Sequence, residues 1–255
     1  MTALRLADAG EAADLAAFLA RLIHYDRAAA VRLQAGGGVL AVFGRPPSFE
    51  VLAIRTARLA PAASGPSAGT GAAPAIGFDR TVSAGDLLEG IDESADSLTL
   101  PAAVTGPPWA GVLPPRGGWR QVPGLPSPQA LGRTVALAVA EFRARDEALP
   151  PERRTRAERD RIGREIWSRT LGDTHLPLRA AHAAQSLGFL RPARAGAQAF
   201  GHGPAGTGPG HGGAALAEPP ALTLLAAGGW LRLRTPYGSV AVRTGGPSAL
   251  PVTPA

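Results

Sequence analysis

The residues of this chain that could take part in catalysis are few, and their types exclude several reactions. The chain contains no Cys, and all 26 of its basic residues are Arg, so it has no Lys. Without Cys there is no thiolate nucleophile, no disulfide and no zinc–thiolate or iron–sulfur site. Without Lys there is no Schiff-base chemistry and no Walker-type phosphate-binding lysine. Acid–base chemistry would have to rely on the 20 acidic residues, the 5 His and Arg.

Two short patterns contain the residue types of a catalytic site without its structural context. Residues 65–69 read G-x-S-x-G, which in a nucleophile elbow places the serine, here Ser67, between a strand and a helix. The flanking residues are rich in Ala, Gly, Ser and Pro and predict neither element. His24 lies near Asp26 at the expected end of a helix, where such a residue is usually satisfied by local contacts. We therefore expect no catalytic role for Ser67 or His24.

Two further groups could bind a metal ion by residue type alone. Asp92, Glu93 and Asp96 cluster after a short predicted helix, but they lack the spacing of a calcium loop, so we expect a surface turn. His202 and His211 lie in a Gly-rich run and would make a weak transition-metal site. That run also lacks the Lys and the strand–loop–helix context of a phosphate cradle. The sequence therefore predicts no catalytic residue, no cofactor and no metal site.

The elements that must position any functional residue are two segments of alternating hydrophobicity. Residues 29–56 read as three short strands joined by two tight turns, and residues 222–244 repeat this pattern in a degraded form. In each segment a Gly-Gly pair separates the first two strands, which favours a hairpin because both residues can adopt positive φ. Each second turn contains Pro, at Pro46 and Pro47 in the first segment and at Pro236 in the second.

The two segments can be aligned residue by residue. The first hairpin of each segment matches at five positions: Leu33, Ala35, Gly37, Gly38 and Leu40 in the first segment, and Leu224, Ala226, Gly228, Gly229 and Leu231 in the second. The second turn is three residues longer in the first segment. Beyond it the third strands match: Leu52, Ala53, Ile54, Arg55 and Thr56 with Val240, Ala241, Val242, Arg243 and Thr244. An internal duplication explains this match, and so do two similar hairpins in a chain rich in Ala and Gly. In the second segment Leu231 and Leu233 are predicted to face the core. Trp230, Arg232 and Arg234 then face the other way.

About five helices are expected around these strands. Residues 8–25 show a capping pattern at Asp8 and Glu11 and an apolar stripe of helical period. Further helices are expected at residues 84–93, from Ser127 onwards, at 152–171, and at 178–187 before Gly188. Short strands are expected at 76–82, around Leu98 and at 119–122. The fold class is therefore α+β: two antiparallel three-stranded meanders, sharing one sheet or forming two small ones, packed with about five helices.

The predicted domain organisation is a single domain, residues 1–255, built from two related halves at about 1–100 and 127–245. Composition indicates flexible segments at 60–75 and 191–220, and a Pro-rich tail at 246–255. No run approaches the length of a membrane span, and no signal peptide is recognised, so we expect a cytoplasmic protein without membrane contact. The excess of Ala, Gly, Pro and Arg is typical of a GC-rich coding bias.

A Pro-, Gly- and Trp-rich region at residues 98–126 is the most irregular part of the chain. Trp109, Trp119 and Arg120 form a possible interaction surface there. Two hypotheses remain open for the tryptophans: they close the core as aromatic caps, or they form a recognition surface.

The net charge of +6 is concentrated in the second half, where residues 151–200 hold 10 Arg and 5 acidic residues. This charge could attract an acidic partner or belong to a mixed, solvated helix face. Residues 176–190 loosely resemble the recognition helix of winged-helix proteins. The resemblance implies a DNA-binding segment at 152–244 that ends in a hairpin wing. Its base contacts would come from the exposed side of the helix, at Arg179, His182, Gln185 and Ser186.

Three functional hypotheses follow. The first is a non-enzymatic protein-interaction or scaffold, chaperone-like module with an unknown protein partner, because no catalytic constellation is present. The order of helices and meanders resembles that of the type VII secretion-associated chaperones, in element order only, which implies a pseudo-twofold arrangement. The alternative is a DNA-binding regulator. The third is an enzyme acting through Asp92, Glu93 and Asp96 with a distant His, and we lean against it.

Overall fold

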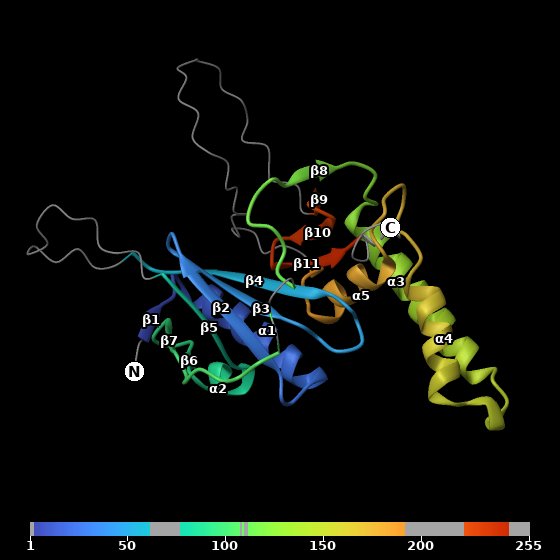
Figure 1. Cartoon of the computed structure of the whole chain (residues 1–255), viewed down its shortest axis with the longest axis horizontal. Coiled ribbons are helices and arrows are strands. Elements are labelled where there is room, and N and C mark those ends of the chain that lie inside the picture. Colours follow the sequence, from blue (N-terminus) through green and yellow to red (C-terminus); the bar gives the residue numbers. More distant parts are fainter. Residues whose placement is uncertain (1–2, 62–76, 108, 110–111, 192–221, 245–255) are drawn as a thin grey trace, which may run out of the picture.

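The computed structural model describes residues 3–61, 77–107, 109, 112–191 and 222–244. It confirms the α+β class: helices pack around antiparallel sheets (Figure 1). Most of the segments at 60–75 and 191–220, and the tail at 246–255, lie outside the described residues. Ser67, His202 and His211 lie outside them as well.

One eight-stranded sheet forms the centre of the molecule, in the order β5-β2-β3-β4-β11-β10-β9-β8. Its strands are β2 (Ala30–Gly36), β3 (Val39–Gly44), β4 (Leu52–Arg58), β5 (Phe78–Ser83), β8 (Arg120–Val122), β9 (Thr223–Ala227), β10 (Trp230–Thr235) and β11 (Gly238–Arg243). Every neighbouring pair is antiparallel. The two meanders therefore share a single sheet.

The seam between the two halves is the pairing of β4 with β11, in which Val240 lies opposite Ala53. Outward from this seam each half contributes the other two strands of its meander and then one further strand, β5 on one side and β8 on the other. This order fits an internal duplication and also fits two independent hairpins that meet at one edge.

The Gly-Gly turns have the conformation that the sequence predicts. Gly37 and Gly38 have φ values of 59° and 75°, and Gly228 and Gly229 have φ values of 51° and 75°. Two successive residues with positive φ define the turn that matches the right-handed twist of a two-residue hairpin. A side chain at these positions would be strained, because L-residues rarely adopt this region.

The third strand corrects the alignment of the two segments. Leu40 pairs with Ala57 in β3–β4, whereas Leu231 pairs with Val242 in β10–β11, so Val242 corresponds to Ala57 and not to Ile54. The longer connection between β3 and β4 shifts the register by three residues. Because side chains alternate with period two, an odd shift reverses the faces. Leu52 and Ile54 consequently lie on the face opposite to that of Val240 and Val242.

The main core lies on the face of the sheet that the helices cover. Helix α1 (Ala9–Tyr25) packs against β4, and α5 (Leu178–Ser186) packs against β11. Leu231 and Leu233 are buried in this core, as predicted. The apolar stripe of α1 contributes Leu15, Phe18, Leu19 and Leu22.

The second face of the sheet carries a smaller apolar cluster. It contains Phe43, Leu52, Ile54, Trp109, Trp230 and Ala241, with Leu113 and Trp119 packed at its edge. Trp109, at 7% exposure, belongs to this cluster, which favours the core-cap hypothesis for this residue over the recognition surface.

Helix boundaries follow capping residues in the sequence. The Asp8 carboxylate accepts from the Glu11 N–H at 2.9 Å and starts α1. Ser127 caps α3 (Pro128–Glu147) in the same way. Gly188, with a φ of 74°, follows the end of α5.

Several predicted boundaries were wrong by a few residues. Helix α2 (Ala84–Glu89) ends at Gly90, so Asp92 belongs to the short strand β6 (Ile91–Asp92). Helix α4 spans Arg156–Trp167, because Thr155 caps it after a 3-10 turn (η1, Pro151–Arg153). A strand that the sequence did not indicate, β1 (Ala3–Arg5), pairs with β7 (Ser97–Thr99), which pairs in turn with β6 in a three-stranded sheet.

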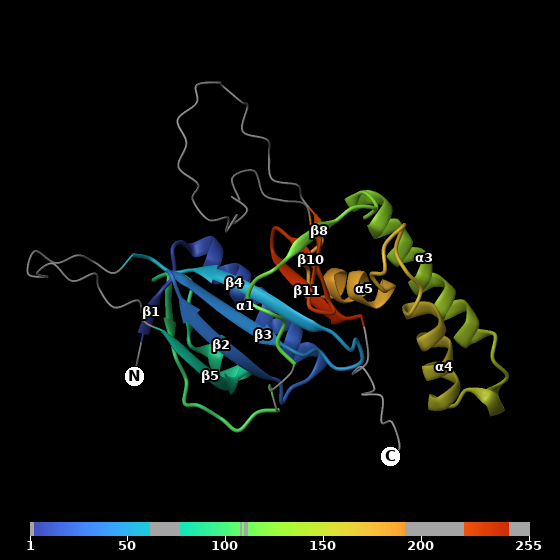
Figure 2. The same cartoon turned by 45° about the horizontal axis from the view of Figure 1, so that its top comes forward.

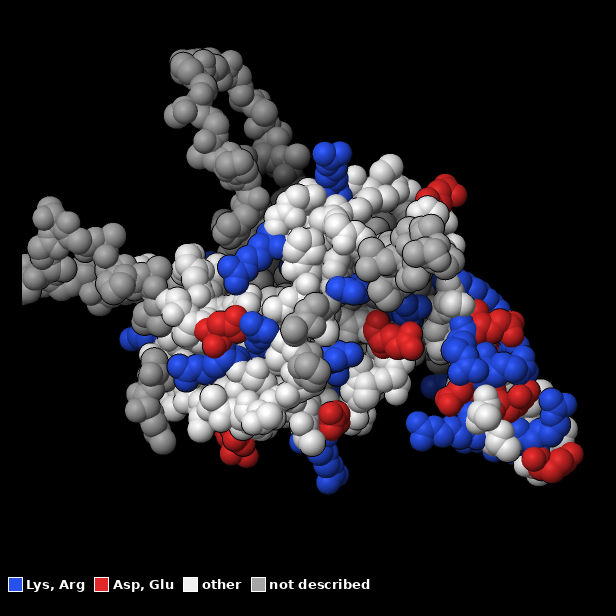
Figure 3. Space-filling model, in the orientation of Figure 1, with Lys and Arg blue, Asp and Glu red and all other residues white. Residues whose placement is uncertain are grey.

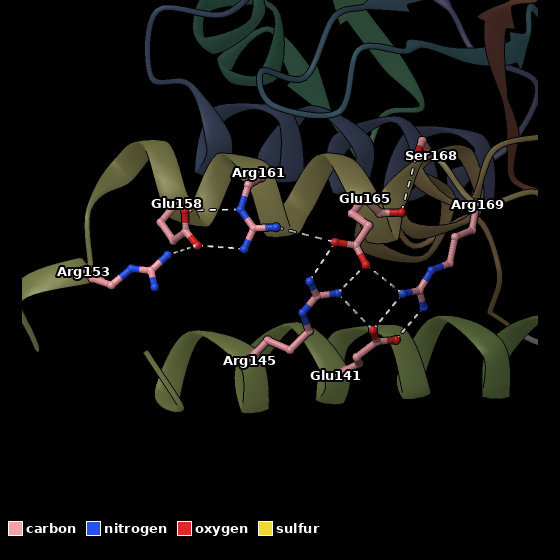
Figure 4. A network of polar contacts seen from close by, with 8 residues as sticks. All are labelled: Glu141, Arg145, Arg153, Glu158, Arg161, Glu165, Ser168 and Arg169. Atoms are coloured by element: carbon pink, nitrogen blue, oxygen red, sulfur yellow. Dashed lines mark hydrogen bonds and ion pairs between the residues drawn. The ribbon is translucent and has the colours of Figure 1, made fainter. Parts of the chain in front are cut away.

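Helices α3 and α4 form a hairpin that projects from the sheet, which both views of the ribbon show (Figures 1 and 2). Acidic and basic side chains alternate over its surface (Figure 3). A network of ion pairs links the two helices, with Arg145 bound to Glu165 and Arg169 bound to Glu141 (Figure 4). We call this hairpin the helical arm.

Candidate anion-binding groove

A cavity lies where the ends of strands β9, β10 and β11 approach the start of α5. Its volume is about 820 Å³, and it is open to solvent. Arg120, His175, Arg179 and Arg243 line it together with Trp230 and the Gly228–Gly229 turn. We call it the cationic groove. The lining residues that the structure describes include no Asp or Glu.

Each basic side chain reaches the groove from a different element. Arg120 lies on the edge strand β8, opposite Ala226 of β9. Arg179 lies in the first turn of α5, and His175 lies in the loop before that helix. Arg243 ends β11, where its guanidinium stacks on the Trp230 ring at 5.2 Å from the ring centroid. Segments far apart in sequence thus bring positive charge to one place.

The charge of Arg179 is poorly compensated within the protein. Its Nε atom is buried and has no hydrogen-bond partner among the described residues. The carboxylate that faces it, that of Glu50, lies at 3.8 Å and is 81% exposed. An exposed pair at this distance is weak, because water screens it. The Arg179 side chain is 26% exposed, so the outer part of its guanidinium retains donor capacity for a ligand.

A second depression of about 300 Å³ adjoins the groove. It shares Trp230 and Arg243 with the groove and adds Arg45, Glu50 and Leu52. The two depressions together form an extended surface, at which the largely buried side chains of Trp230 and Leu52 are only slightly exposed. Such a surface suits an elongated ligand that carries several negative charges and an apolar group.

The start of α5 adds to the positive potential of the groove. Pro177 occupies the N-cap position and provides no side-chain acceptor for the first N–H groups of the helix. The partial positive charge of a helix N-terminus favours an anion nearby. This contribution reinforces the Arg cluster at the same place.

The predicted interaction residues divide between the groove and the core. Arg120 lines the groove, Trp109 is buried on the second face of the sheet, and Trp119 is half-buried beside that cluster. The Trp119 Nε1–H donates to the Pro115 carbonyl at 3.0 Å. The structure thus brings Arg120 together with Arg179, a residue that the sequence assigned to the DNA-binding alternative.

His182 corrects the predicted exposed side of the fifth helix. Its ring stacks on Trp167 at 4.2 Å between centroids and meets Phe49 edge-on at 5.2 Å. Burial among these rings lowers the pKa of His182 and disfavours its charged form. Gln185 is exposed and Ser186 half-buried, so the four residues do not share one solvent-facing surface. The sequence pattern correctly predicted that His182 lies in a helix. It did not predict the contacts of His182 with Trp167 and Phe49, because those two residues belong to other elements.

The hairpin that the winged-helix resemblance implied as a wing does not lie free at the edge of a domain. β10 and β11 lie inside the eight-stranded sheet, with β11 paired to β4, whereas a wing is a free hairpin at the edge of its domain. Sequence reasoning did not propose His175 or Arg243 as site residues. Arg243 follows Val240 and Val242 in a strand pattern and had no local feature that indicated a site.

The acidic residues proposed for the enzyme hypothesis form a turn. The Asp92 carboxylate accepts from the N–H and hydroxyl of Ser94 and from the Ala95 N–H, which lowers the pKa of Asp92. Within the described ranges, no three His, Asp or Glu side chains lie close enough to hold a metal ion. The helices in those ranges are all too short or too polar to span a bilayer.

The structure is that of an α+β protein in which strands β2–β5 of the first half and β8–β11 of the second half form one sheet beside the cationic groove. Residues 114–247 match the family described as a domain of unknown function (DUF8185), and the chain belongs to this family. Residues 1–111 match a second family, described as a domain of unknown function (DUF8010). No curated protein and no solved structure matches the chain. The β4–β11 seam joins the two matched regions within one sheet.

Proposed function

We propose that this protein is a non-enzymatic protein-interaction module of the cytoplasm, with a scaffold- or chaperone-like role, that binds an acidic segment of a partner protein in the cationic groove. The observation that carries this proposal is the composition of the groove. Arg120, His175 and Arg179 come from three separate elements and meet around a cavity whose described lining has no carboxylate.

Acidic side chains are the ligands that this lining suits. A guanidinium presents a planar fork of donors that pairs with a carboxylate through two hydrogen bonds. Several Arg side chains around one cavity raise the local potential and speed the encounter with an anionic partner. Trp230, at 7% exposure, packs against the Arg243 guanidinium and helps to hold that cation at the groove.

A peptide segment fits the groove better than a DNA duplex does. Of the four candidate base-contacting residues of α5 only Gln185 is classed as exposed, so the helix offers few side chains to a major groove. The groove is concave and lies beside the helix. An extended acidic segment can enter it, whereas a duplex is too wide to do so.

The test is a binding titration with a labelled peptide rich in Glu and Asp, with the same peptide carrying Gln and Asn as the matched control. We expect the acidic peptide to bind and its affinity to fall as salt rises from about 50 to 300 mM, because exposed charges are screened. The variants Arg120→Ala and Arg179→Ala should each weaken binding roughly tenfold, since a lost charged contact costs about 1–2 kcal/mol. Arg164→Ala, an equal charge change on the helical arm, should have no effect.

Two outcomes would contradict the proposal. Absence of acidic-peptide binding at low salt would refute it, and so would equal weakening by Arg120→Ala and Arg164→Ala. A duplex oligonucleotide is titrated in parallel. If the duplex binds with a steep salt dependence that Arg179→Ala reduces, and the peptide does not bind, the DNA-binding alternative replaces the proposal.

A further inference from the structure

A third, smaller cavity lies on the second face of the sheet, at the turn between β10 and β11. Its volume is about 40 Å³. Arg232 and Arg234 line it, together with Thr56, Ser239 and the turn residues Thr235 and Gly238. It lies near the end of β10 that is remote from Trp230, so it is separate from the cationic groove.

Arg232 is held on this face by the alternation of β10. Its neighbours Leu231 and Leu233 face the main core, which directs Arg232 to the second face. The Arg232 Nε–H donates to the Ser239 Oγ at 2.9 Å. The guanidinium carbon lies 5.9 Å from the centroid of the Trp119 ring, which shields it from water. Burial, with a smaller contribution from the Arg234 charge, lowers the pKa of Arg232 to about 10.

No carboxylate compensates the two guanidinium groups among the residues that the structure describes. The positive charge of Arg234 repels that of Arg232, which contributes to the lowered pKa of Arg232. Another buried arginine shows the usual solution: Arg55 has Glu11 at 2.8 Å and Asp14 at 3.5 Å. Arg232 is largely withdrawn from water, and a second cation beside it, that of the half-buried Arg234, is costly unless an anion joins them.

Two hydroxyl groups in the cavity can complete a set of donors. The Ser239 Oγ accepts from Arg232, so the proton of its own hydroxyl is available for a ligand. Thr56 projects from β4 into the same cavity. The Thr235 hydroxyl differs, because it donates to the Gly238 carbonyl at 3.0 Å and accepts from the Tyr237 N–H.

We propose that Arg232 and Arg234, with the hydroxyls of Thr56 and Ser239, bind a single tetrahedral oxyanion of the phosphate type. The donors surround one small space from two sides, and a phosphate group offers acceptor oxygens in all directions. The volume exceeds the roughly 10–15 Å³ that one water requires, and it is too small for a nucleoside. The anion is either inorganic phosphate or a phosphoryl group at the end of a larger ligand.

The experiment measures thermal unfolding and calorimetric binding of the full chain with inorganic phosphate and, separately, with phosphoserine. At a concentration of about 100 times Kd, a ligand that binds the folded state should raise the Tm by roughly 5–10 °C for a chain of this size. The variants Arg232→Met and Arg234→Gln should weaken binding at least tenfold. Arg232→Met keeps an unbranched side chain of similar length under Trp119 and should fold, and Ser239→Ala provides a milder second variant. Arg164→Gln, on the helical arm, is the matched control and should leave phosphate binding unchanged, and Arg179→Gln reports any separate binding in the cationic groove.

Each outcome supports or refutes the site. Binding of phosphate without phosphoserine identifies the free ion, and stronger binding of phosphoserine identifies a phosphoryl group on a larger ligand. The proposal is wrong if neither compound binds, or if Arg179→Gln abolishes the binding that Arg232→Met leaves intact. The acidic-peptide titration does not involve Arg232, so failure of one proposal leaves the other standing.

Discussion

The Arg55 Nη2 atom donates to the Glu11 Oε2 atom at 2.8 Å, in the layer between β4 and α1, and both side chains are less than 10% exposed. The Arg55 Nη1 atom donates at 3.0 Å to the carbonyl of Tyr237, in the β10–β11 turn. One buried guanidinium therefore ties α1 and β4 of the first region to the second region. Arg191 adds to this link, because it pairs with Asp14 and its guanidinium carbon lies 3.7 Å from the centroid of the Tyr237 ring.

Replacing Arg55 by Met should destabilise the protein strongly. Glu11 would remain buried near Asp14 with only the partly exposed Arg58, at 2.9 Å, as a counter-ion, and loss of one partner of a buried pair costs about 3–5 kcal/mol. Urea denaturation measures the change in unfolding free energy. Arg32→Met is the matched control: it breaks the pair with Asp79, which is 41% exposed, and should cost less than about 1 kcal/mol.

The double variant Arg55→Met with Glu11→Leu makes the test sharper. Removing both charges leaves fewer uncompensated groups, so the double variant should be more stable than Arg55→Met alone. A loss below about 1 kcal/mol for Arg55→Met would mean that the buried pair contributes little.

Most strands and the α-helices could be predicted because their signals are local. Gly228 and Gly229 identify a hairpin by themselves, and Ser127 followed by Pro128 identifies a helix start. The role of Arg55 could not be predicted in this way. The alignment of the two segments matched Arg55 with Arg243 and indicated no ion-pair partner for it. The carboxylate that Arg55 binds, that of Glu11, lies 44 residues away on a different element.

The groove illustrates the same limit. Arg120 and Arg179 were both proposed from the sequence, but for different functions, since no periodicity connects a strand of three residues with a helix turn. Pairing of β8 with β9, which places Arg120 opposite Ala226, brings them to one cavity. Long-range strand pairing depends on the whole sheet and leaves no local pattern.

Replacing Trp109 by Ala should lower the unfolding free energy by about 3–5 kcal/mol, because a large side chain leaves a packed cluster. Acidic-peptide affinity should remain unchanged, since Trp109 lies outside the cationic groove. Chemical denaturation and the peptide titration provide the two measurements. Leu137→Ala, at a residue that is 72% exposed, is the control and should change stability by less than about 0.5 kcal/mol. A Trp109 variant that keeps its stability but loses peptide binding would favour the recognition-surface hypothesis instead.

The helical arm should lose protection from hydrogen exchange in acid before the central sheet does. Hydrogen bonds from Arg169 and Arg145 lower the pKa values of Glu141 and Glu165. A carboxylate whose folded pKa is below its unfolded value, about 4.3, stabilises the fold above that pH. This contribution is lost as the pH falls through the lower, folded value.

Amide protection factors, corrected for the intrinsic effect of pH, measure this change in α3 and α4 between about pH 6 and pH 3. The double variant Glu141→Gln with Glu165→Gln should reduce the pH dependence, and the remainder should come from carboxylates such as Glu158, whose pKa is lowered by its hydrogen bond from Arg161. Equal loss of protection in α3, α4 and the β4–β11 seam would show that the ion pairs do not stabilise the arm selectively.

His182 should make stability depend on pH in a different range. Burial between Trp167 and Phe49 lowers its pKa in the folded state, so below about pH 6.5 the unfolded chain binds a proton that the folded chain does not. Stability from this residue is complete above that pH and declines as the pH falls. His182→Phe keeps an aromatic ring in the stack and should flatten the dependence of Tm on pH between about 7.5 and 5.5. His24→Phe, at the end of α1, is the control and should retain the dependence. If the His182 variant retains it as well, the stacked imidazole is not its source.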